Sequence, residues 1–177
     1  MARIWKHLAI RRYRFLARLA AALLLILTSI PAHADDDSAW QRQDKKGIRT
    51  ASIAFGLNNV LAITCPASLP TAQPVLLLHV QVLQAEFSYK TRYNLRIVID
   101  DFRADFGMTA KDGSLFFEAT DFNQRDAFQG MVQELIKAAH NGEDHAQVAV
   151  FSLGWRGDIP LASADEALDG LMDGCGE

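Results

Sequence analysis

The sequence predicts an α+β domain with a mostly antiparallel, curved sheet of about seven short strands. One long helix and one short helix are expected near its C-terminal end. The first observation is that apolar and polar residues alternate in several segments between residues 48 and 119, which is typical of half-buried strands. The second is that the apolar spacing changes to three and four residues beyond position 121, which indicates an amphipathic helix.

The strands are predicted from this alternation and from the turn residues between them. Tyr93–Ile99 shows the clearest alternation, and Asp112-Gly113 favours a tight hairpin turn. Asp35–Lys46 is polar and is expected to be a lead-in, whereas the glycines of Gly154–Asp158 indicate a loop. The predicted strands are 48–55, 60–65, 75–83, 93–99, 102–108, 115–119 and 147–153.

Two helices follow from spacing and capping residues. Asp121 or Asn123 is expected to cap the first helix, and Asn141-Gly142 to end it. Its apolar stripe consists of Phe128, Met131, Val132, Leu135, Ile136 and Ala139. Ser163 and Glu166 have the spacing of a capping box, which predicts a short second helix with Ala167 and Leu168 facing inward.

The first 34 residues have the three parts of a secretory signal peptide. Met1–Arg18 holds six basic residues and no acid, Leu19–Ile30 is apolar or small, and Ala32-His33-Ala34 resembles a cleavage site. The uncharged run from residue 19 to 34 falls short of the about 20 apolar residues that a membrane anchor needs. We therefore expect export, cleavage after Ala34 and a single periplasmic domain over residues 35–177. Arg11-Arg12 comes close to a twin-arginine signal, so the twin-arginine route is the alternative to the favoured general secretory route.

Charge and cysteine content narrow the function classes. All 21 acids follow Ala34 but only 12 of the 18 basic residues do, so residues 35–177 carry a formal charge of −9. This disfavours binding to nucleic acids and to anionic lipids, and we expect no membrane insertion after cleavage. Cys65 and Cys175 are the two cysteines, and in an oxidising compartment they are expected to form a disulfide. A redox-active or nucleophilic thiol is the alternative, but the sequence contains no Cys-x-x-Cys motif.

The order of these features resembles the periplasmic family of the invasion-associated locus B protein. The resemblance rests on the signal peptide, the early Trp40, the strand ending near Cys65, the strand Leu95–Asp100, the helix carrying Phe128–Leu135, and the segment Ile159–Leu161 with Ala167-Leu168. It implies a non-enzymatic envelope protein, linked in some members to host-cell entry. The resemblance provides no active-site residues.

Binding is the leading functional hypothesis. Trp155 and Arg156 lie in the predicted glycine-flanked loop, and tryptophan and arginine dominate interface energies. The alternative for Trp155 is that it covers the edge of the core. Tyr89 and Arg92 belong to a second aromatic and basic patch, which also includes Lys90, Tyr93 and Arg96. We expect a protein partner that is recognised by these surfaces, with no cofactor.

An enzyme is the weaker hypothesis. A periplasmic hydrolase or metal-dependent enzyme would use Asp100, Asp101 and His79, but the chain has none of the standard catalytic motifs. His140, Asp144 and His145 lack a standard metal-ligand spacing, so no metal site is expected. Arg156-Gly157-Asp158 spells the tripeptide that integrins recognise, although a match of three residues recurs by chance.

Overall fold

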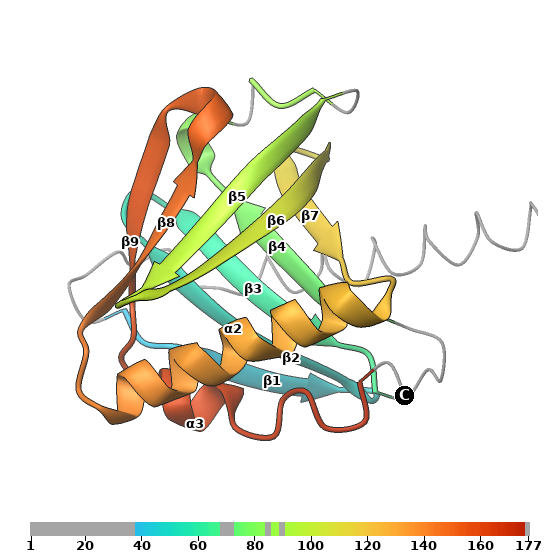
Figure 1. Ribbon diagram of the computed structural model, residues 1–177, viewed down its shortest axis with the longest axis vertical. Coiled ribbons are helices and arrows are strands. Elements are labelled where there is room, and N and C mark those ends of the chain that lie inside the picture. The colour runs from blue at the N-terminus through green and yellow to red at the C-terminus, as the bar shows by residue number, and fades with distance from the viewer. Residues whose placement is uncertain (1–37, 68–72, 84–85, 89–90, 176–177) are drawn as a thin grey trace, which may run out of the picture. The chain divides into compact units, whose positions relative to one another are not determined.

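The fold is a single antiparallel sheet of nine strands with two helices on one face, seen in a computed structural model (Figure 1). The structure describes residues 38–67, 73–83, 86–88 and 91–175. The signal peptide predicted over 1–34 lies outside these ranges. The strands, in the spatial order β1-β2-β3-β4-β7-β6-β5-β8-β9, are β1 (Gln41–Lys45), β2 (Ile48–Phe55), β3 (Asn59–Cys65), β4 (Val75–His79), β5 (Arg92–Ile99), β6 (Phe102–Lys111), β7 (Ser114–Glu118), β8 (His145–Val150) and β9 (Trp155–Pro160).

The alternation read from the sequence separates the two faces of the sheet. On β5, Tyr93, Leu95, Ile97 and Ile99 are buried, whereas the residues between them are exposed or half-buried. We call the face with these buried residues the inner face and the opposite one the outer face. Successive side chains of a strand point to opposite faces, so the register of each strand decides which residues enter the core.

Tight turns join the neighbouring strands of the sheet. Asp112 and Gly113 connect β6 to β7 with positive φ angles of 50° and 74°, as the Asp-Gly pair predicts. Asp100, with φ of 51°, and Asp101 form the turn between β5 and β6. Both aspartates are therefore in an exposed turn rather than on a strand.

Helix α2 (Phe122–His140) crosses the inner face of the sheet (Figure 1). Asp121 caps its N-terminus, accepting a 2.9 Å hydrogen bond from Gln124 N–H. Phe128 is fully buried and stacks against Phe117, with ring centroids 6.2 Å apart. This packing positions α2 over β6 and β7.

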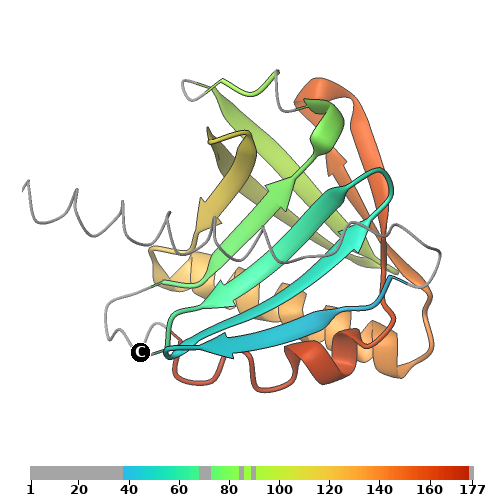
Figure 2. The ribbon, with the colours of Figure 1, turned by 180° about the vertical axis from the view of Figure 1, so that it is seen from behind.

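The sheet curls strongly, as Figure 2 shows from behind. β9, at one edge, comes back against β2, next to the other edge, and the rings of Phe55 and Trp155 lie 6.4 Å apart. Trp40 is buried and its Nε1 donates a 2.9 Å hydrogen bond to Pro160 O. The approach of the two edges encloses the core without joining the edge strands into a ladder.

The C-terminal segment is fastened to the beginning of the sheet. Helix α3 (Ala164–Leu168) leads to Cys175, which is disulfide-bonded to Cys65 at the end of β3, as predicted. Arg49 on β2 donates a 2.7 Å hydrogen bond to Gly170 O, and a second one to Asp173 O. Arg42 on β1 donates to Asp169 O in the same segment.

Several local predictions were wrong, and those for β1 and β9 share a reason. The lead-in contains strand β1, the expected loop 154–158 lies mostly in strand β9, and the predicted strand 75–83 ends at His79 before a 3₁₀ turn. Ser163 adopts φ of 58° and makes no capping hydrogen bond, so the capping box is absent. Edge strands such as β1 and β9 are paired on one side, and their residues follow the neighbouring strand more than their own propensity.

None of the helices within the described ranges is long and apolar enough to span a membrane.

Candidate functional site

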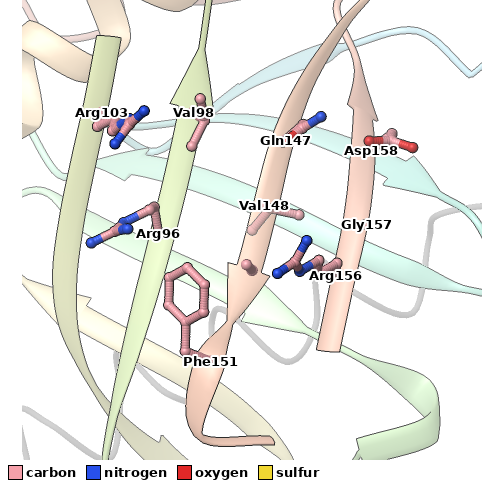
Figure 3. A pocket seen from close by; sticks show the side chains of 10 residues that line it. Arg96, Val98, Arg103, Gln147, Val148, Phe151, Arg156, Gly157 and Asp158 are labelled. Atoms are coloured by element: carbon pink, nitrogen blue, oxygen red, sulfur yellow. The ribbon is translucent and has the colours of Figure 1, made fainter. Parts of the chain in front are cut away.

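A shallow cavity of about 450 Å³ lies on the outer face, over β5, β6, β8 and β9 (Figure 3). Three arginines line it, Arg96, Arg103 and Arg156, together with a single carboxylate, Asp158. The remaining lining residues are small, apolar or amide-bearing: Val98, Gln147, Val148, Ala149, Phe151 and Gly157. The cavity is therefore basic in a segment, 35–177, whose formal charge is −9.

The strand register arranges these residues in two rows across the sheet. The first row runs Asp105, Arg96, Ala149, Arg156 from β6 to β9. The second row runs Arg103, Val98, Gln147, Asp158 along the same four strands. Neighbouring strands lie about 4.8 Å apart, so the small side chain of Ala149 leaves a hollow between two arginines whose strands are roughly 10 Å apart.

Arg96 is fixed by two neighbours. Its Nε and Nη2 donate hydrogen bonds of 2.7 and 2.8 Å to the two carboxylate oxygens of Asp105. These hydrogen bonds raise the pKa of Arg96 and lower the pKa of Asp105. Arg96 Cζ also lies 4.8 Å from the ring centroid of Phe151, in the 3₁₀ turn Phe151–Leu153 between β8 and β9. A bidentate ion pair and a cation–π contact therefore hold one wall of the cavity in place.

Arg156 on β9, like Arg103 on β6, is a cation of the site without a hydrogen bond or ion pair among the described residues. Within the same residues the side chain of Asp158, two residues after Arg156, has no such partner either. Figure 3 shows the Arg156 side chain reaching from β9 toward β8, and the Phe151 ring between β8 and β5. A guanidinium group presents a planar set of donors that matches a carboxylate or a phosphate. The arrangement is suited to binding an anionic group.

The residues predicted to bind a partner are separated by the structure. Arg156 lines the cavity, but Trp155 points to the inner face, where it is half-buried against Phe55. Arg92 is exposed on the outer face of β5, about 13 Å along the strand from Arg96. Tyr89 lies outside the described residues.

Sequence reasoning missed Arg103 and Phe151, and it placed Arg96 in another patch. The alternation of apolar and polar residues on β5 and β6 assigns Arg96 and Arg103 to the outer face, so the sequence could have predicted that both arginines lie on this face. The pairing of β5 with β8, which is distant in sequence, leaves no local signal. The cavity exists because of this pairing.

The three residues considered for catalysis do not meet. Asp100 and Asp101 adjoin Phe102, at one end of β6, whereas His79 pairs with Ser114 beyond the other end of β6. The length of β6 separates these ends by roughly 30 Å. His79 Nδ1 lies 3.1 Å from Ser114 Oγ, which gives this histidine a local hydrogen-bonding role.

A second cavity of about 420 Å³ lies near the C-terminal end of α2 and is acidic. Its lining includes Glu143, Asp144 and Asp165, together with His145. In the part of the chain that the structure describes, no group of three or more His, Cys, Asp or Glu residues is arranged to hold a metal ion.

Comparison of the chain with protein families, curated proteins and solved structures found no match.

Proposed function

We propose that this chain is an exported, periplasmic, non-enzymatic binding protein that recognises an acidic segment of another envelope or secreted protein. The binding surface is the outer face of β5, β6, β8 and β9 around the cavity. Residues 1–34 are the signal peptide, and the mature protein begins after Ala34. This proposal agrees with the resemblance to the invasion-associated locus B family.

The observation that carries the proposal is the unpaired Arg156 beside an exposed aromatic ring. Phe151 is 46% exposed and forms a wall of the same cavity. Arginine and aromatic residues that lie together on a surface are typical of the sites that dominate binding energies. Since residues 35–177 carry a formal charge of −9, a negatively charged partner meets less electrostatic repulsion at this basic region than over the acidic surface.

Site-specific crosslinking tests this function. A photoreactive benzoylphenylalanine replaces Phe151 in one variant and Phe122 in a control variant, and irradiation is carried out on intact cells that export the protein. Phe122 is the matched control because it is also an exposed phenylalanine, 71% accessible, at the start of α2. We expect a discrete crosslinked product from position 151 that position 122 does not form.

The charge of the site is tested in the same experiment. Arg156→Glu should abolish the product formed at position 151, whereas Lys111→Glu, a charge reversal at the end of β6 outside the cavity, should leave it unchanged. Raising the ionic strength should weaken the product, since exposed charges are screened over about 10 Å at 0.1 M salt. A product that persists in Arg156→Glu would refute the proposed surface.

A further inference from the structure

β9 is an edge strand of the sheet immediately beside the cavity, and β2 packs against its inner side through Phe55 without forming a ladder with it. β9 stands last in the strand order, and β8 is the one strand paired with it among the described residues. In an antiparallel ladder alternate residues direct their N–H and C=O groups toward the neighbouring strand, and the others direct them away. Trp40 covers the C-terminal end of β9, since its Nε1 donates to Pro160 O and its backbone N–H donates to Ala162 O. The open stretch is therefore Trp155–Ile159.

The opposite edge strand, β1, differs in how its charges are paired. Arg42 forms a salt bridge of 3.2 Å with Asp44 on the same strand, and also donates to Asp169 O. On β9, Arg156 and Asp158 are both exposed on the outer face, and neither side chain has a partner among the described residues. β9 thus presents an unpaired cation and an unpaired anion on one face, whereas on β1 the charged residue without a partner among the described residues is Lys45.

We propose that β9 receives an extended segment of the protein partner as an added antiparallel strand, with a basic–apolar–acidic sequence. This inference rests on the proposed function and names the kind of segment that is recognised. Every strand pair of the sheet is antiparallel, so an added strand continues the same pattern. Edge strands with unpaired backbone groups are the usual acceptors for such segments.

The charges of β9 fix the register of the added strand. Residues directly opposite one another on one face of an antiparallel pair interact, and opposite charges are favoured there. The acidic residue of the segment therefore lies opposite Arg156, and the basic residue lies opposite Asp158. The acidic residue continues the row in which Arg96 already pairs with Asp105.

The middle position of the segment lies opposite Gly157 and faces inward. A Cβ atom added to Gly157 would meet the rings of Phe55 at 3.1 Å and Trp155 at 3.2 Å, so these two rings occupy the space beside the glycine. An apolar side chain on the added strand would extend this apolar surface. The inner face consequently selects an apolar residue between the two charged ones.

Synthetic peptides provide the probe. Acetyl-Thr-Val-Lys-Val-Glu-Val-Thr-amide has the proposed order, and the matched control exchanges its Lys and Glu. Each peptide is titrated into ¹⁵N-labelled protein, residues 35–177, and the amide shifts of β9 give the dissociation constant. We expect the first peptide to bind about tenfold more tightly, because two favourable cross-strand pairs become two unfavourable ones in the control. Equal binding of the two peptides would refute the proposed register.

A charge exchange in the protein should reverse the preference. The double variant Arg156→Asp/Asp158→Arg alters two exposed side chains, so the fold should be retained, and the circular dichroism melting curve checks this. In this variant the peptide with exchanged charges should bind more tightly. An unchanged preference would show that Arg156 and Asp158 do not contact the peptide.

N-methylation of the peptide tests strand addition separately from charge recognition. One peptide is methylated on the Lys and Glu amides, and another on the three Val amides. In a ladder with β9 one of these sets donates to the edge and the other faces solvent, so binding should be lost for one peptide and kept for the other. If both peptides bind while the crosslink at position 151 still requires Arg156, the proposed function stands and strand addition is refuted.

Discussion

Removal of the Cys65–Cys175 disulfide should lower the free energy of unfolding by about 4–5 kcal/mol. The bond joins residues separated by 110 positions. In the chain-entropy model, opening a loop of this size returns conformational freedom to the unfolded chain worth about 4.7 kcal/mol at 25 °C. This is a large part of the ~5–15 kcal/mol by which native proteins are stable.

The folded state should keep its C-terminal segment in place after this change. Leu168 and Leu171 are buried on either side of the residues that Arg42 and Arg49 bind, so the segment has contacts independent of the disulfide. Removal of the disulfide should therefore lower the free energy of unfolding without detaching the C-terminal segment from the folded protein. Near-ultraviolet circular dichroism of the variant should match that of the parent protein.

The assay is urea unfolding of residues 35–177, comparing the parent protein with Cys65→Ala/Cys175→Ala. Tryptophan fluorescence and far-ultraviolet circular dichroism should give coincident transitions in both proteins. Since Cys65 is fully buried, its replacement by Ala adds a small packing cost. A loss below about 1 kcal/mol would refute the entropic reasoning.

Three further predictions concern packing and charge. Trp40→Ala removes an indole that is 4% exposed and should cost about 3–5 kcal/mol in urea unfolding. Gly157→Ala places a methyl group 3.1 Å from the Phe55 ring and should cost about 1–3 kcal/mol, with a disturbed near-ultraviolet spectrum. Hydrogen bonding to Arg96 lowers the pKa of Asp105 in the folded protein. The ionised Asp105 side chain therefore adds to the free energy of unfolding at a pH above the pKa of the unfolded chain, and this addition is lost as the pH falls through the lower pKa of the folded protein. Asp105→Asn should therefore be less stable than the parent protein at neutral pH and equally stable at strongly acidic pH; a constant difference would contradict this.

The elements with strong periodic patterns were predictable from the chain alone. The alternation of apolar and polar residues predicted the central strand β5, and the Asp112-Gly113 pair predicted the β6–β7 turn. The apolar stripe containing Phe128 predicted α2. These signals are local, because the inner and outer faces of a strand or helix are encoded within a few residues. The Cys65–Cys175 bond followed from the presence of just two cysteines.

The candidate site was predictable only in part. Arg156 was chosen for its residue type, but the residues that line the cavity with it come from β5, β6, β8 and the 3₁₀ turn after β8. Trp155 was chosen by the same reasoning, yet its side chain faces inward toward Phe55. Neighbouring residues of a strand point to opposite faces, so a loop assignment for 154–158 necessarily grouped two side chains that the strand separates.

By itself the sequence determined the α+β class, the amphipathic faces of the longer elements and the pairing of the two cysteines, because each depends on local spacing or simple counting. The order of the strands, the edge position of β9 and the cavity around Arg156 were decided by the tertiary structure. They depend on pairings between distant segments, such as β5 with β8, whose register no local pattern contains.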